Sequence, residues 1–107
     1  MKKILLPILL ALLLAACDQT GAQRDAVDEQ DPRVRSGLEQ VHLQNWDKAI
    51  AQFEKALAKN PDLARPDLEL ALIYHQRKND YIKAIYHYQR YLEKRPATEK
   101  RQLILDW

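Results

Sequence analysis

The stretch NWDKAIAQFEKALAKNP at residues 45–61 returns in altered form as NDYIKAIYHYQRYLEKRP at residues 79–96. In both stretches apolar residues recur three and four positions apart, which is the spacing of one face of an α-helix. The matched pairs, each 35 positions apart, are Trp46–Tyr81, Ala49–Ala84, Phe53–Tyr88, Ala56–Tyr91, Leu57–Leu92 and Pro61–Pro96. A fixed period of this length is typical of helical repeat proteins, so the sequence predicts an all-α chain of repeated helical hairpins.

The residues before the first stretch also follow a helical pattern. Asp31 followed by Pro32 is typical of a helix start, because aspartate caps free backbone amides and proline suits the first turn. Val34, Leu38 and Val41 then lie on one face of the same expected helix. From residue 32 onward no run alternates with a period of two, so no strand is expected.

The repeat resembles that of the tetratricopeptide (TPR) family, whose units of about 34 residues each contain two antiparallel helices. The resemblance depends on a small residue where the helices cross, an aromatic residue four positions later and a closing proline. These positions are Ala49, Phe53 and Pro61 in the first unit and Ala84, Tyr88 and Pro96 in the second, with Leu70, Ala71 and Tyr74 matching the first helix of the second unit. The resemblance implies a TPR-like hairpin solenoid over 32–107, with repeats at about 32–63 and 64–98. Tyr91, where Ala56 stands in the first unit, departs from the pattern and predicts that helix packing after the second unit is looser or shifted.

Residues 97–107 are expected to form a capping helix after the second repeat. Leu103, Ile104 and Trp107 would cover the apolar side that the repeat leaves open, since repeat arrays need such caps. The sequence ends on an apolar tryptophan without a capping glycine. This ending is consistent with a minimal capped domain or with a chain cut short, and we favour the second interpretation.

The beginning of the chain is typical of an export signal. Lys2 and Lys3 precede an apolar run at 4–14, which is too short for a membrane-spanning helix of about 20 residues. The following LAAC at 14–17 resembles the lipobox of bacterial lipoproteins. The resemblance implies that residues 1–16 are removed and that Cys17, the single cysteine, carries the lipid. The alternative is an ordinary signal peptide with a chance cysteine near its cleavage site.

The residues after the cysteine bear on location. Asp18 and Gln19 resemble the signal that keeps enteric lipoproteins at the inner membrane, which implies a lipid-anchored protein on the periplasmic face of that membrane. Alternatively, the two residues simply begin a polar tether. Residues 17–31 contain no apolar periodicity, so we expect a flexible tether there.

The sequence holds no pattern typical of catalysis or metal binding. His42, His75 and His87 are the only histidines, and no two have the spacing of a zinc site. No glycine-rich phosphate loop or nucleophile motif occurs. Without Lys2 and Lys3, basic and acidic residues are equal in number, which argues against nucleic-acid binding. We therefore expect no enzyme activity, cofactor, metal ion or small-molecule substrate.

The remaining interpretation is a binding protein. In TPR proteins the first helix of each unit lines the inner face, and the resemblance implies that a partner protein or peptide binds there. The candidate partner-binding residues are Leu38, Val41, Leu68, Leu72 and His75. Leu68 and Leu72 are equally well explained as core residues. Tyr81, Tyr88 and Tyr91 occupy structural positions of the repeat, so we expect them to pack rather than to form a binding platform.

Three functions fit this interpretation. The first is a membrane-anchored adaptor that holds a partner protein at the cell envelope. The second is an assembly factor at the outer membrane, similar to pilotin-like lipoproteins, and the location set by Asp18 would separate it from the first. The third is a degenerate catalytic protein, for which the sequence provides no site.

Overall fold

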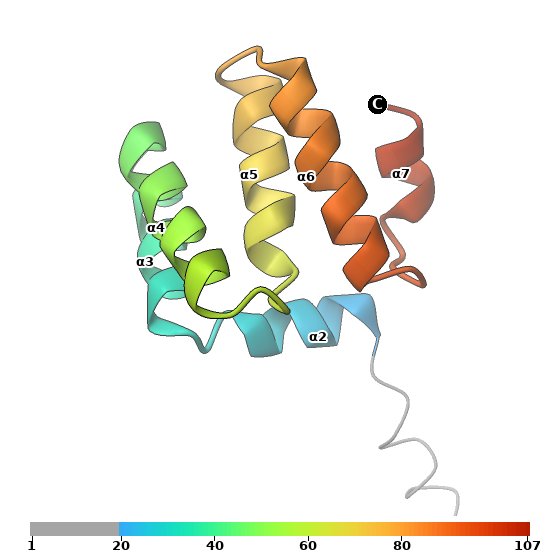
Figure 1. Cartoon of the computed structure of the whole chain (residues 1–107), viewed down its shortest axis with the longest axis horizontal. Coiled ribbons are helices and arrows are strands. Elements are labelled where there is room, and N and C mark those ends of the chain that lie inside the picture. The colour runs from blue at the N-terminus through green and yellow to red at the C-terminus, as the bar shows by residue number, and fades with distance from the viewer. Residues whose placement is uncertain (1–19) are drawn as a thin grey trace, which may run out of the picture.

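The computed structural model describes residues 20–107. Its helices are α2 (Gly21–Asp28), α3 (Pro32–His42), α4 (Trp46–Lys59), α5 (Arg65–Gln76), α6 (Tyr81–Lys94) and α7 (Arg101–Leu105). Helices α3 and α4 form one hairpin, α5 and α6 form a second beside it, and α2 lies across one end of the molecule (Figure 1). The described residues contain no strand, so the prediction of an all-α protein is confirmed for this range.

The two hairpins share their turn geometry. Helices α4 and α6 each contain 14 residues and begin 35 positions apart. Gln44 and Asn79, also 35 positions apart, precede these helices with positive φ angles of 59° and 53°. This left-handed conformation is tolerated well by asparagine and is uncommon for glutamine. The repeat in the sequence therefore extends to the backbone of the turns.

A close approach of α3 to α4 holds the first hairpin together. A Cβ atom at Gly37 would lie 2.5 Å from Cε1 of the Phe53 ring, closer than real Cβ atoms come. Phe53 is fully buried, so its ring has no free space into which it could move. Gly37 is thus the small residue at this helix crossing, which the sequence pattern did not identify.

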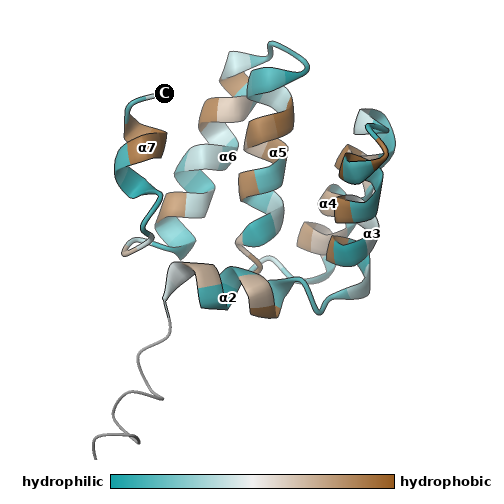
Figure 2. Ribbon diagram, turned by 180° about the vertical axis from the view of Figure 1, so that it is seen from behind, coloured by the Kyte–Doolittle hydropathy of each residue, from teal (hydrophilic) through white to brown (hydrophobic). Residues whose placement is uncertain are grey.

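Apolar side chains from both hairpins meet around α5, whose middle turns are strongly hydrophobic (Figure 2). The buried core consists of Val34, Ala49, Phe53, Ala56, Leu63, Ala64, Leu68, Leu70, Ala71, Ile73, Tyr74, Ala84, Tyr88, Tyr91 and Ile104. The prediction that Tyr88 and Tyr91 pack in the core is confirmed. Tyr81 differs, because 58% of its surface remains exposed.

Tyr91, the departure from the repeat pattern, packs inside the molecule. Its ring is fully buried, and its hydroxyl donates a hydrogen bond to Oδ2 of Asp25 in α2 at 2.6 Å. Thr98 Oγ1 lies 3.1 Å from the same hydroxyl. Burial, together with the hydrogen bond to Asp25, raises the pKa of Tyr91 to about 12. The large residue therefore connects the second hairpin to α2.

The expectation of a flexible tether over 17–31 is corrected by α2, which occupies much of that range. Thr20 and Gln23 form a capping box at its start, in which each side chain accepts a hydrogen bond from the other residue's backbone amide. The composition predicted disorder because it offers little apolar surface. The helix is held instead by buried carboxylates, since Asp25 and Asp28 are both shielded from solvent.

Asp28 attaches α2 to the start of α5. Its Oδ2 accepts hydrogen bonds from the backbone amides of Ala64 at 2.9 Å and Arg65 at 3.0 Å. Ala64 has no side-chain oxygen, so Asp28 caps α5 from 36 positions away. Arg95 Nη2 lies 3.0 Å from the same oxygen and Arg95 Nε lies 3.3 Å from Asp25. These contacts join α2 to both helices of the second hairpin.

The predicted capping helix over 97–107 is reduced to the five residues of α7. Ile104 is buried as expected. Leu103 is exposed, which corrects the expectation that it covers the second repeat, and Trp107 is half-exposed. A helix of this length places only one side chain in the core, because its turns return to the same face every 3.6 residues.

Candidate functional site

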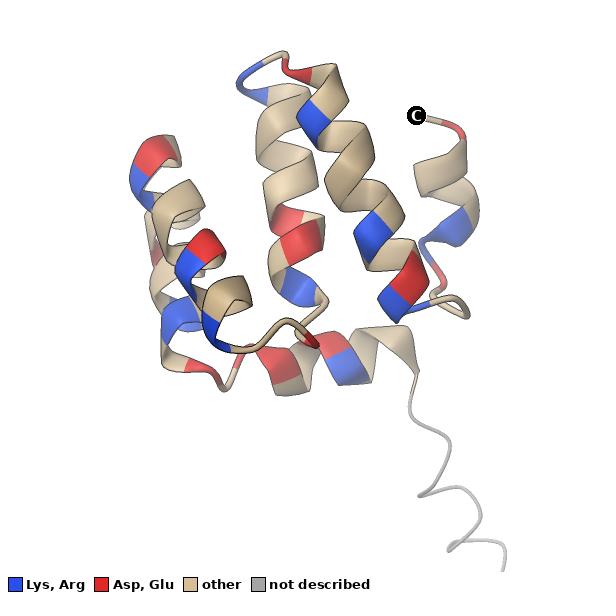
Figure 3. Cartoon of the chain, in the orientation of Figure 1, with Lys and Arg blue, Asp and Glu red and all other residues tan. Residues whose placement is uncertain are grey.

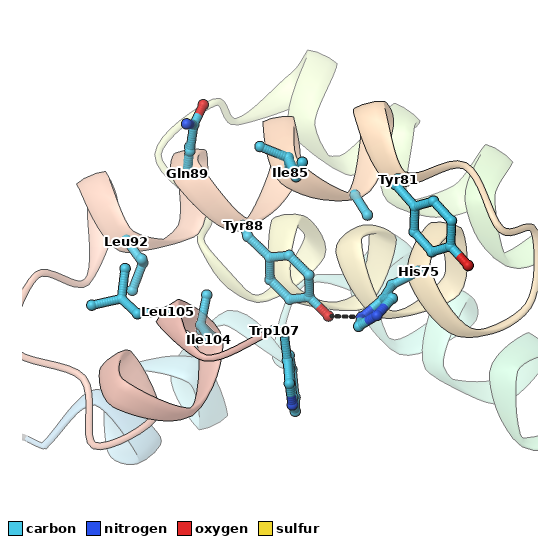
Figure 4. A pocket seen from close by; sticks show the side chains of 10 residues that line it. His75, Tyr81, Ile85, Tyr88, Gln89, Leu92, Ile104, Leu105 and Trp107 are labelled. Carbon is cyan, nitrogen blue, oxygen red and sulfur yellow. Dashed lines mark hydrogen bonds between the residues drawn. The ribbon is translucent and has the colours of Figure 1, made fainter.

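A groove of about 380 Å³ lies between α6 and α7, with the end of α5 at its base. We call it the α6–α7 groove. It is lined by His75, Tyr81, Ala84, Ile85, Tyr88, Gln89, Leu92, Ile104, Leu105 and Trp107. Figure 4 shows these side chains, with Tyr81 and Ile85 toward one end of the groove and Leu92 and Ile104 toward the other.

One stripe of α6 forms the main wall of the groove. Tyr81, Ile85, Tyr88 and Leu92 follow one another at intervals of three or four residues, so they lie on a single helix face. The stripe changes in exposure along its length. Tyr88 is buried and Leu92 is partly buried, whereas Ile85 is 56% exposed. The wall is therefore covered at its C-terminal end and open at its N-terminal end.

An aromatic cluster closes the base of the groove. His75 Nδ1 and the Tyr88 hydroxyl pair at 3.1 Å. The Trp107 ring packs on both, with centroid distances of 5.9 Å to His75 and 5.6 Å to Tyr88. Burial raises the pKa of Tyr88 to about 12, so its hydroxyl stays neutral even at moderately alkaline pH. The most buried polar groups of the site thus satisfy each other.

The α6–α7 groove differs from its surroundings in charge. None of the ten lining side chains is Asp, Glu, Lys or Arg. Figure 3 shows that charged residues occur on all the described helices of the chain, so their absence from this lining is a local feature. An uncharged, aromatic and aliphatic wall suits apolar side chains of a ligand, whereas anionic or cationic groups would lose hydration there without a partner.

A second, smaller hollow of about 130 Å³ lies on the opposite side of α5. Val41 of α3, Trp46 of α4 and Leu72 of α5 contribute to it. The Arg77 guanidinium stacks over the Trp46 ring at 4.7 Å from its centroid, a cation–π contact that joins the end of α5 to the start of α4.

The candidate partner-binding residues do not form one surface. Val41 and Leu72 share the smaller hollow, and His75 lies in the α6–α7 groove on the other side of α5. Leu68 is buried in the core, and Leu38 packs against it. The groove wall on α6 was not among the sequence candidates, because its residues occupy positions that are core in the first repeat.

Cys17, Asp18 and Gln19 lie outside the described residues. Within residues 20–107, none of the helices has the length and apolar character needed to cross a membrane. The same range shows no group of three or more His, Cys, Asp or Glu side chains that could hold a metal ion.

Comparison of the chain with models of protein families, with curated proteins and with solved structures finds no match.

Proposed function

We propose that this protein is a membrane-anchored adaptor, a bacterial lipoprotein whose helical domain holds a partner protein at the periplasmic face of the inner membrane. The LAAC sequence at 14–17 supports the lipid anchor. Asp18 and Gln19 support the choice of the inner membrane over the outer membrane. A lipidated Cys17 would bind strongly, because each acyl CH₂ contributes about 0.8 kcal/mol and several chains act together.

The observation that carries the adaptor function is the uncharged α6–α7 groove. Two of its polar side chains, His75 and Tyr88, are paired with each other, and most of the remaining lining is aliphatic or aromatic. Binding sites for small molecules usually present a few free, convergent polar groups beside their apolar walls. A groove that is mostly apolar and has no charged lining side chain favours the apolar side chains of another protein. Catalysis, a cofactor and nucleic-acid binding form no part of the proposal.

We further propose that the two hairpins are TPR-like units. Their second helices have equal length and begin 35 positions apart. The close approach of Gly37 to Phe53 in the first hairpin is the kind of helix crossing that the repeat requires. Ala71 is the small residue that the sequence resemblance assigns to the corresponding place in the second hairpin.

Fractionation of cells that produce the full chain tests this function. Wild-type protein should enter the detergent phase on phase separation, and mass spectrometry should find Cys17 as its acylated first residue. Cys17→Ser should stay uncleaved or remain in the aqueous phase. Chemical crosslinking should then join the anchored wild-type protein to another envelope protein in a discrete adduct. Normal membrane partitioning of Cys17→Ser contradicts the anchor, and absence of any crosslinked partner contradicts the adaptor.

A further inference from the structure

The α6–α7 groove exposes residues whose counterparts in the first hairpin are covered. Trp46, Ile50 and Phe53 of α4 lie 35 positions before the groove residues 81, 85 and 88. Phe53 is fully buried, and Trp46 and Ile50 are partly buried against the core. On α6, only the counterpart of Phe53 is buried, while positions 81 and 85 are more than half exposed. The same helix face is thus covered in one repeat and open in the next.

The element that covers α4 is a helix. Helix α5, 12 residues long, runs antiparallel to α4, since Arg77 at its end stacks on Trp46 at the start of α4. Lys78 forms an ion pair with Asp47 at 2.5 Å, which fixes the same orientation. The first hairpin therefore shows that this helix face can be covered by an antiparallel helix.

Helix α7 covers only part of the equivalent face on α6. At 1.5 Å per residue, its five residues extend about 7.5 Å, compared with about 18 Å for α5. Ile104 and Trp107 reach Tyr88 and the C-terminal half of the stripe. About two helical turns of α6, around Tyr81 and Ile85, remain without a covering helix in the described residues.

We propose that this open part of the α6–α7 groove, at Tyr81 and Ile85, binds an amphipathic α-helix of a partner protein that packs antiparallel to α6. The proposal rests on the adaptor function and names the partner's chemistry. The helix presents apolar residues at intervals of three and four, because the α6 stripe has the same spacing. Its contacting face is uncharged, because the groove wall is uncharged. The surface continues the existing contact of α7 with α6, so the bound helix extends an interface that is already formed.

Site-specific photocrosslinking in the native host tests the proposal with the full, anchored chain. A benzoylphenylalanine residue is placed at Ile85, in the groove, or at Ile82, which is 84% exposed on the same helix but outside the groove. The probe at position 85 should yield a discrete adduct with another protein, and the probe at 82 should not. The crosslinked segment of the partner should carry apolar residues at helical spacing.

A synthetic peptide of that crosslinked segment should then bind the purified protein in detergent and change the fluorescence of Trp107, measured in a Trp46→Phe background. Ile85→Glu should weaken peptide binding by at least about tenfold, because a carboxylate in the uncharged groove loses hydration. Ile82→Glu adds the same charge outside the groove and should leave the affinity unchanged.

Four results would overturn the proposal. An adduct of two copies of this chain through position 85 would assign the groove to self-association. Equal adducts from positions 82 and 85, or none from 85, would remove the groove as a docking site. A crosslinked segment without helical periodicity would refute the stated partner. A probe at Leu72, in the smaller hollow, distinguishes failure of this proposal from failure of the adaptor function. An adduct at position 72 with none at position 85 would refute the groove as the binding site but would still support the adaptor function.

Discussion

Replacing Gly37 with alanine tests how closely α3 packs on α4. The added Cβ would lie 2.5, 2.7 and 2.8 Å from three atoms of the Phe53 ring. All three distances are shorter than a carbon–carbon contact, and the ring is fully buried, so the helices must separate or the ring must leave its rotamer.

Two opposing effects set the size of the change. Alanine is favoured over glycine inside a helix by about 1 kcal/mol. Overpacking of a close-packed core typically costs about 1–3 kcal/mol. The contact with a rigid ring in three places makes overpacking the larger effect, and we expect Gly37→Ala to lower the free energy of unfolding by up to about 2 kcal/mol. For a domain of this size, each 1 kcal/mol corresponds to a change of about 4–8 °C in the melting temperature.

A double-mutant cycle gives the decisive measurement. Thermal unfolding, followed by circular dichroism on residues 18–107, compares Gly37→Ala in the wild-type and Phe53→Leu backgrounds. Removing the ring leaves room for the methyl group, so the same substitution should raise the melting temperature in the second background, through its helix propensity of about 1 kcal/mol. A rise in both backgrounds would show that α3 and α4 do not approach as closely as described.

The other predictions concern α2, α7, alkaline pH and location. The pKa of Tyr91 rises from 10.0 to about 12 on folding, so its contribution to stability is complete below pH 10 and is lost as the pH rises toward 12. We expect the free energy of unfolding to fall by about 1–3 kcal/mol over this range, as measured by urea unfolding. Tyr91→Phe should lessen this fall. Asp28→Ala should lower the free energy of unfolding by about 2 kcal/mol or more in thermal unfolding, because α5 loses its N-cap and the buried ion pair with Arg95 is broken. Unchanged stability would mean that α2 does not pack against the second hairpin. Ile104→Ala should lower the free energy of unfolding by about 2–5 kcal/mol because Ile104 is buried, and Leu103→Ala should lower it by less than about 0.5 kcal/mol because Leu103 is exposed. Equal effects of the two substitutions in calorimetry would contradict the packing of α7. In a host that follows the enteric sorting rule, Asp18→Ser should move the protein to the outer membrane on a density gradient, and an unchanged position would favour the simple tether.

The hairpins could be predicted from sequence because their signals are local. The apolar spacing in α4 and α6 repeats within each helix, and Asp31 with Pro32 marks the start of α3. Helix α2 carries one local signal, its Thr20–Gln23 capping box, but could not be predicted from apolar spacing. Its stability depends on Asp25 meeting the hydroxyl of Tyr91, 66 positions later, and no property of the segment itself indicates that contact.

The candidate site shows the same limit. The sequence assigns Tyr81 to a structural position because Trp46 occupies that position in the first repeat. Whether such a residue is covered depends on the length of the next helix, and five residues in α7 cannot replace the twelve of α5. Periodicity identified the helix face correctly, but only the packing of the last helix revealed that part of it is open.

The docking of α2 would also determine how far a lipid-anchored form of the protein reaches from a membrane. If Cys17 carries the lipid, four extended residues span at most about 14 Å before the first turn of α2. Gly21 lies against Thr98, near the end of α6, and the 14 residues of α6 then extend about 21 Å to Tyr81. The open groove therefore stays within roughly 40 Å of the bilayer surface. Under the proposed anchor, a partner helix would have to lie in this shallow layer, which would favour the membrane-proximal segments of proteins in the same membrane and raise their effective concentration at the groove.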